Sequence, residues 1–330
     1  MLENASKQQI YAYIQARQKA RVSDLWRDLG FSRQLIQRRL KELTAEDVIQ
    51  KSGKPPLVFY QAVPKSQQSD KVQISQEVTD FIDKEYLYVS PLGEIIYGFA
   101  GFTKWADSIK ERRHLAQLSL EYKKVCEEAK KHFNDFGFID ATRKLHQTFT
   151  DVYLEKVYYL DFYALPKFGK TKFGQLVLYS KQAQKYDLIK SLSLQVKPKI
   201  EELLVREKID AVSFIPPTVP RNLQFIKEFE KILNLNLPKV DLSKAYLGDI
   251  PVAQKTLSRL EERVENASRT IFVKNTSNKF NRMLLLDDAV GSGSSLNETA
   301  KKLVNEGLAE SVVGFAIVGS YKGFEVIREV

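Results

Sequence analysis

The sequence predicts an α/β fold in its C-terminal half, a parallel sheet with flanking helices, preceded by a helix-turn-helix region and a helical middle region. Three observations carry this prediction. Beyond residue 166, short apolar runs alternate with helical patterns, which is the order typical of a parallel sheet. Residues 1–63 hold three short helical patterns followed by two short apolar runs. Residues 104–136 hold one long helical pattern.

Composition narrows the class of protein. The chain has 330 residues, which favours two or three domains. Its net charge of +10 favours an anionic partner. Cys126 is the single cysteine, so a disulfide framework and a four-cysteine zinc site are excluded. The polar N-terminus does not resemble a signal peptide, and no apolar run is long enough to span a membrane. We therefore expect a soluble, cytoplasmic protein.

Residues 1–63 predict a DNA-binding module. Gly30 ends a short helix, and Ser32 caps the next one. This is the spacing of a helix-turn-helix, and the two apolar runs that follow resemble the hairpin of a winged helix-turn-helix. Side chains that reach base edges and phosphates follow the cap or lie at the wing, so the predicted DNA-binding residues are Ser32, Arg33, Gln34, Gln37, Arg38, Lys51 and Lys54. A helical domain for protein contacts is the alternative.

Residues 64–83 are predicted to be a linker, because their first half is polar. Residues 84–165 form the mixed, mainly helical middle region. Within the helical pattern at 104–136, apolar residues recur in steps of three and four from Leu115 to Phe136, with one polar position at His132. This heptad pattern predicts either a dimerisation helix, and hence a homodimer, or a helix that packs on its own chain.

The stretch "ALPKFGKT", residues 164–171, fits a relaxed phosphate-loop pattern and raises the alternative of a nucleotide triphosphatase. Two local features oppose it. Ala164 stands where the first glycine should be, and Pro166 removes one of the backbone N–H groups that should hold the phosphate.

A second anion-binding pattern is "LLLDDAVGSGSSL", residues 284–296. An apolar strand, expected at 283–286, leads to Asp287 and Asp288, and a helix is expected from Ser295. Backbone N–H groups at a helix N-terminus favour a phosphate group. The two carboxylates can accept hydrogen bonds from sugar hydroxyls or hold a magnesium ion. The pattern therefore predicts a ribose 5-phosphate ligand.

These residues resemble the phosphoribosyl-diphosphate loop of type I phosphoribosyltransferases, with a departure at Gly291, where the family usually has threonine. The resemblance covers about half of the chain. It implies a ribose 5-phosphate loop made of Asp287, Asp288, Ala289, Val290, Gly291, Ser292, Gly293, Ser294 and Ser295. It places a pyrophosphate loop at Thr218, Val219, Pro220, Arg221 and Asn222. It implies magnesium carried by the ligand.

Residues 254–272 are similar to a segment of the competence protein F (ComF) family, with Gln254, Leu257, Arg263 and Asn266 matching after one inserted residue. The resemblance makes this the mobile loop that closes on the substrate, with Lys255, Arg259 and Arg263 as the basic residues. The zinc-binding segment common in that family is excluded by the single cysteine. The phosphoribosyltransferase-like domain is expected to span 166–330.

The order of modules favours a regulator. It resembles that of the purine repressor of Gram-positive bacteria, which joins a winged helix to a phosphoribosyltransferase-type domain that senses a metabolite. We therefore expect a transcriptional regulator that binds double-stranded DNA and senses phosphoribosyl diphosphate or a nucleotide. The alternative is an active phosphoribosyltransferase, which displaces pyrophosphate with a nitrogen base.

Overall fold

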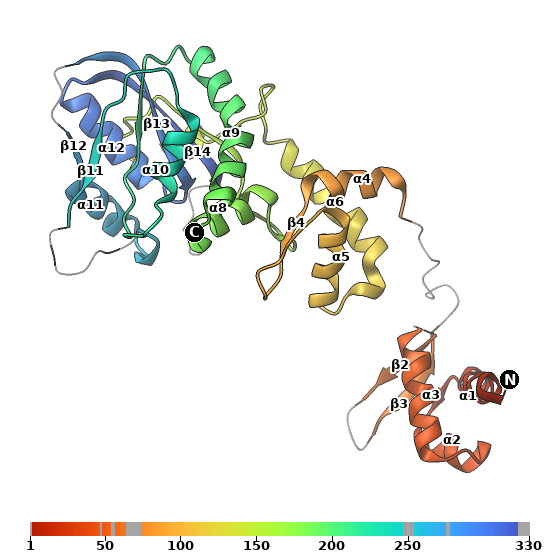
Figure 1. Cartoon of the computed structure of the whole chain (residues 1–330). Coiled ribbons are helices and arrows are strands. Elements are labelled where there is room, and N and C mark those ends of the chain that lie inside the picture. The colour runs from red at the N-terminus through yellow and green to blue at the C-terminus, as the bar shows by residue number, and fades with distance from the viewer. Residues whose placement is uncertain are drawn as a thin grey trace. The chain divides into compact units, whose positions relative to one another are not determined.

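The computed structural model describes residues 2–46, 48–53, 57–63, 74–246, 248, 252, 254–274 and 278–322. It divides into two compact units, Met1–Gln73 and Ile74–Val330 (Figure 1). Each unit is described by itself. In the part of the chain that the structure describes, no helix combines the length and the apolar character needed to cross a membrane.

The N-terminal unit packs three helices against a small antiparallel sheet. Its elements are α1 (Leu2–Arg17), β1 (Lys19–Ala20), α2 (Val22–Leu29), α3 (Arg33–Ala45), β2 (Ile49–Ser52) and β3 (Phe59–Ala62), with the strands in the order β1-β3-β2. Gly30 ends α2 at φ 70°, a left-handed conformation that glycine adopts without strain. The Ser32 side chain caps α3 by accepting a hydrogen bond from the backbone N–H of Leu35. The unit has a hydrophobic core of its own, in which Ile36 and Leu40 of α3 are buried.

The expected linker at 64–83 is too long by several residues. Helix α4 (Gln76–Glu85) begins inside it, because Ser75 caps the helix and Val78 and Ile82 bury an apolar face. Residues 64–73 lie outside the described residues.

The expected helix at 104–136 is two helices. The segment after α4 consists of β4 (Leu87–Val89), β5 (Ile95–Tyr97), α5 (Gly98–Ser108), η1 (Arg112–His114), α6 (Leu115–Lys130), β6 (Ile139–Asp140) and α7 (Thr142–Thr148). The apolar positions Leu118, Tyr122 and Ala129 of α6 are buried in the core of their own unit. Of the two interpretations of the heptad pattern, packing on the same chain is the one that the structure shows.

A five-stranded sheet forms the centre of the C-terminal unit. Its strands are β6, β7 (Lys156–Phe162), β10 (Ala211–Phe214), β13 (Phe280–Val290) and β14 (Ala309–Gly319), in the order β10-β13-β14-β7-β6. The first four in this order are parallel, and β6 is antiparallel to β7. Strand β7 belongs to this sheet although it precedes residue 166, the boundary that the sequence predicted.

Helices cover both faces of the sheet (Figure 1). Side chains alternate along β13, so Met283 and Leu285 join one buried cluster while Leu284 and Leu286 join the other. The first cluster includes residues of α12 (Ser294–Asn305), and the second includes residues of α8 (Lys172–Ala183), α9 (Tyr186–Arg206) and α10 (Phe225–Leu233). The remaining elements are β8 (Ala164–Leu165), β9 (Gly169–Lys170), β11 (Leu242–Lys244), η2 (Gln254–Thr256), α11 (Leu260–Thr270) and β12 (Ile271–Val273).

Candidate functional site

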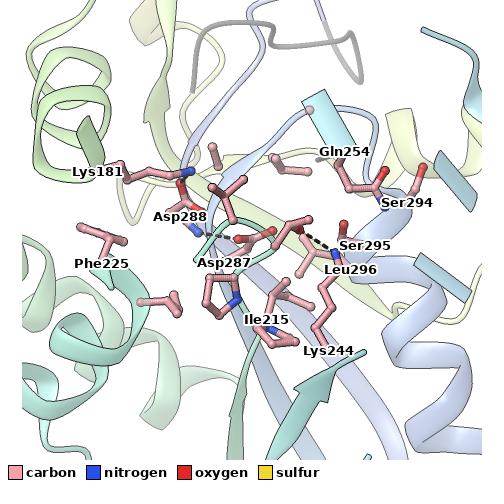
Figure 2. Close-up of a pocket in the computed structure, with 18 of the residues that line it drawn as sticks. Lys181, Ile215, Phe225, Lys244, Gln254, Asp287, Asp288, Ser294, Ser295 and Leu296 are labelled. Atoms are coloured by element: carbon pink, nitrogen blue, oxygen red, sulfur yellow. Dashed lines mark hydrogen bonds and ion pairs between the residues drawn. The ribbon is translucent and has the colours of Figure 1, made fainter. Parts of the chain in front are cut away.

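A pocket lies beyond the carboxyl ends of β10 and β13, where parallel sheets commonly bind ligands. All nine residues from Asp287 to Ser295 line it, and Figure 2 labels Asp287, Asp288, Ser294 and Ser295 among them. The loop after β10 and residues of α8, α10, β11 and the 254–263 segment complete its wall. The other lining residues are Lys181, Ile215, Pro216, Pro217, Thr218, Val219, Arg221, Gln224, Phe225, Ile226, Lys244, Gln254, Arg263 and Leu296.

The two acidic residues lie on a strand. The strand expected at 283–286 continues to Val290, because Asp287 pairs with Ala316 of β14 and Ala289 pairs with Val318. The carboxylates interrupt the apolar run, so the sequence pattern ended the strand too early. As a consequence, backbone hydrogen bonds to β14 hold this wall of the pocket in place.

The glycine-serine loop turns the chain from β13 into α12. Gly293, at φ 79°, is the N-cap of α12, which begins at Ser294 and so one residue earlier than predicted. The first N–H groups of a helix have no partner within it and favour an anion. The hydroxyls of Ser292 and Ser294 lie 2.9 Å apart and are both buried. One donates to the other, so the pair still holds a second hydroxyl hydrogen for a ligand.

The acidic pair contacts a lysine that the sequence analysis missed. Lys181 Nζ of α8 donates to Asp288 Oδ2 over 2.6 Å, and the two side chains are only 19% and 14% exposed. The backbone N–H of Asp288 donates to Asp287 Oδ1 over 2.8 Å. Burial and the neighbouring Asp288 raise the pKa of Asp287 well above its usual value, although Lys181 acts in the opposite direction. Figure 2 shows Lys181 beside the two carboxyl groups.

The predicted pyrophosphate loop reaches the pocket in part. Thr218, Val219 and Arg221 line it, whereas Pro220 and Asn222 are not among the lining residues. A second lysine that the sequence analysis missed, Lys244 of β11, donates from Nζ to Thr218 Oγ1 over 2.6 Å.

Burial lowers the pKa of Lys244 to about 8, against the opposing influence of Asp287. The hydroxyl of Tyr246 donates to the carbonyl of Thr218. Thr218 is therefore fixed from two sides.

The segment expected as a mobile loop forms η2 and α11 where it is described. Of the two predicted basic residues whose side chains the structure describes, Arg263 lines the pocket and Arg259 does not. Arg263 is 4% exposed, and its Nε donates to the carbonyl of Leu257 over 2.9 Å. Arg259 is exposed and precedes α11. Lys255 lies in η2, and its side chain is outside what the structure describes.

The acidic pair does not fit a magnesium ion held by the protein. Magnesium prefers carboxylate oxygens in octahedral geometry, but Lys181 already occupies an oxygen of Asp288. Within the described residues, no group of three or more His, Cys, Asp and Glu side chains could ligate a metal ion.

Residues 164–171 do not form a phosphate loop. They make the hairpin of β8 and β9, and Thr171 then caps α8. The Thr171 hydroxyl accepts from the N–H of Gly174 over 3.0 Å and donates to the carbonyl of Phe162 over 2.6 Å. The start of α8 is thus capped by its own chain, and residues 164–171 are not among those that line the pocket.

The predicted DNA-binding residues lie in the N-terminal unit. Ser32 caps α3, and the side chains of Arg33, Gln34, Gln37 and Arg38 are exposed along α3. The Arg33 guanidinium lies 4.7 Å from the ring centroid of Trp26, and Arg38 pairs with Glu42 over 3.3 Å. Lys51 is exposed on β2, and Lys54 lies outside the described residues.

Fold and pocket together define a chain with a parallel-sheet α/β unit and a ligand pocket whose lining combines apolar residues with four basic and two acidic side chains. No protein-family model and no curated protein matches this chain. Among solved structures, an adenine phosphoribosyltransferase is similar over 40% of this chain and 70% of its own, with 20% identity and a TM-score of 0.26.

Two further structures are similar. A hypoxanthine phosphoribosyltransferase from Staphylococcus aureus shares 11% identity over 37% of this chain and 61% of its own, with a TM-score of 0.23. An adenine phosphoribosyltransferase from Leishmania tarentolae shares 12% identity over 47% of this chain and 78% of its own, with a TM-score of 0.25. All three TM-scores are low, so these similarities alone do not assign a function to the chain.

Proposed function

We propose that the chain is a transcriptional regulator that senses phosphoribosyl diphosphate or a nucleotide in the pocket of the C-terminal unit and binds DNA through the N-terminal unit. The observation that carries this proposal is the composition of the pocket. The carboxylates Asp287 and Asp288, the start of α12 and basic side chains meet in one cavity. This combination suits a ligand with an anionic end and a polyhydroxylic centre.

In this proposal, each part of the ligand contacts a different wall of the pocket. The 5-phosphate lies against Gly291–Ser295, where helix N–H groups and serine hydroxyls donate hydrogen bonds. Asp287 and Asp288 accept hydrogen bonds from the ribose hydroxyls. Lys181, Arg221, Lys244 and Arg263 leave the described pocket with a formal excess of two positive charges over the two carboxylates, which favours an anionic ligand.

The N-terminal unit supports the DNA-binding half of the proposal. Its third helix is followed by a two-stranded hairpin, which supports the proposal of a winged helix-turn-helix in which α3 would enter the major groove. The arginines and glutamines exposed on α3 reach base edges and phosphates. Lys19 and Arg21 lie 4.0 Å and 4.5 Å from the ring centroid of Phe59, which adds two cations beside the sheet.

An active phosphoribosyltransferase is the second candidate, and the buried position of Arg263 favours it. A basic side chain held inside the pocket can stabilise the charge of departing pyrophosphate. In that reaction the bond from C1 of the ribose to the pyrophosphate oxygen breaks, and a bond from C1 to a nitrogen of the base forms. Release of pyrophosphate on addition of a purine or pyrimidine base would identify the enzyme.

The ligand site is tested by calorimetric titration with phosphoribosyl diphosphate, with ATP as the control ligand. We expect binding of the first and not the second. Changing both Asp287 and Asp288 to Asn should weaken binding by at least about tenfold, because each amide group replaces an oxygen that can accept a hydrogen bond with a nitrogen that cannot. Asp187→Asn, which removes an exposed carboxylate of α9, should have no effect. Unchanged binding by the double variant would place the ligand elsewhere.

DNA binding is tested by measuring affinity over a range of salt concentrations. Changing Arg33 and Arg38 to Ala should weaken binding and make the negative slope of log K against log salt shallower by about 0.9 for each lost phosphate contact. The matched control changes Lys190 and Lys227, two exposed lysines of the other unit, to Ala. A slope that stays the same in the arginine variant would exclude α3 as the DNA-contacting helix.

A further inference from the structure

The ion pair between Lys181 and Asp288 differs from an ordinary surface pair. Both side chains are largely withdrawn from solvent, and the 2.6 Å contact joins residues 107 positions apart in the chain. Exposed ion pairs contribute little because water screens them, whereas partly buried charges require a partner. Without Lys181, two adjacent carboxylates would share one poorly hydrated wall of the pocket.

The fold holds Lys181 at this position. Helix α8 buries Leu176, Val177 and Ser180 on its inner face, so the helix cannot rotate without exposing apolar surface. Gln184, which ends α8 in the left-handed conformation, accepts a hydrogen bond from the N–H of Leu223 through its side chain over 3.1 Å. The end of the helix is thus tied to the chain just beyond the 218–222 loop.

A second lysine approaches the pocket from another element. Lys244 of β11 donates a hydrogen bond to Thr218, whereas Lys181 of α8 contacts Asp288. Figure 2 shows the two ammonium groups on different sides of the acidic pair. The pocket therefore has a cation of its own on each side of the place where a sugar phosphate would lie.

From these contacts we infer that Lys181 is the permanent counter-ion of the acidic pair and that a ribose phosphate binds here without a divalent metal ion. This inference rests on the proposed function. A metal ion would have to displace an ammonium group that the fold already positions on Asp288. The compensated carboxylates can accept hydrogen bonds from sugar hydroxyls while the remaining cations face the phosphate.

Ribose 5-phosphate is the probe, because it lacks the diphosphate that would carry magnesium into the pocket. The full chain is titrated calorimetrically in magnesium and, separately, in EDTA. We expect dissociation constants that agree within about twofold in the two buffers. Tenfold tighter binding in magnesium would overturn the inference and leave the proposed function intact. Absence of ribose 5-phosphate binding in both buffers would overturn this inference, whereas the proposed function is decided separately by the titration with phosphoribosyl diphosphate.

Two substitutions at Lys181 separate charge from packing. Lys181→Gln should lose at least about tenfold in affinity in EDTA and regain part of it in magnesium, since a metal ion can then replace the missing charge. Lys181→Arg keeps the cation and should bind as the unchanged chain does in both buffers. Lys190→Gln, at an exposed position of α9, is the control. Unchanged affinity of Lys181→Gln in EDTA would refute the role of Lys181.

Discussion

At the scale of single residues, the pocket is defined by charges that compensate one another. Lys181 forms an ion pair with Asp288. Lys244 donates a hydrogen bond to Thr218, and the nearby charge of Asp287 acts to raise the pKa of Lys244. An anion that enters such a site meets cations already positioned, so little side-chain entropy is lost on binding. The chemistry of each contact then depends on which groups are charged at the working pH.

Lys244 gives the pocket a predictable pH dependence. Burial lowers its pKa to about 8, so the free protein loses this positive charge as the pH rises through that value. Affinity for ribose 5-phosphate should stay level from about pH 7 to 8, where the phosphate is already a dianion. It should then fall, by up to about tenfold per pH unit. Calorimetric titration between pH 7 and 9.5 measures the dissociation constant of ribose 5-phosphate as a function of pH.

The control for this prediction is Lys244→Arg. Arginine stays protonated throughout the range, so the variant should show a flat profile. A fall of equal size in the arginine variant would mean that another group is responsible.

The two lysines also show where sequence reasoning stops. Ser32, Gly293 and the acidic pair could be identified because their signals are local: a cap, a turn and the end of an apolar run. Lys181 is separated from Asp288 by 107 positions, and no spacing rule connects them. Only the path of α8 across the sheet brings the two side chains together.

At the scale of elements, most strands of the sheet could be predicted from the pattern of apolar residues, whereas the positions of the strand ends could not. β13 was predicted too short because Asp287 and Asp288 break its apolar pattern, although pairing with β14 carries the strand to Val290. The long helix at 104–136 was predicted too long because helical periodicity continues across the break at η1. Tertiary packing decided both outcomes.

A substitution at Gly174 tests whether α8 must pack closely against the backbone at Tyr163. A Cβ added at this position would lie 2.0 Å from the carbonyl oxygen of Tyr163. Gly174→Ala should therefore push the start of α8 away and lower the free energy of unfolding by about 2–3 kcal/mol. Urea unfolding measures the loss. Gln182→Ala, at an exposed position near the other end of α8, should change stability by less than about 0.5 kcal/mol.

At the scale of the whole molecule, a regulator requires that the two units influence one another. Each has its own buried core, with no residue shared between them in the described clusters. Coupling must therefore be measured through binding. If ligand changes DNA affinity by a given factor, DNA must change ligand affinity by the same factor.

We expect this factor to lie between about 5 and 150, the usual range for allosteric proteins. DNA affinity is measured with and without saturating ribose phosphate, and ligand affinity with and without DNA. A chain in which Asp287 and Asp288 are both Asn should bind DNA normally and lose the response to ligand. Full independence of the two affinities would favour the phosphoribosyltransferase over the regulator.

Helix α8 connects the pocket to the beginning of its unit. Its 12 residues span about 18 Å, with Lys181 on the acidic pair near one end. At the other end, Lys172 donates from Nζ to the carbonyl of Lys84 in α4 over 3.2 Å. Because Lys181 stays on Asp288, a ligand that shifts the acidic pair also shifts this end of α8. The hydrogen bond at the opposite end joins α8 to α4, the first helix of the unit, so a displacement at the pocket reaches the start of the unit.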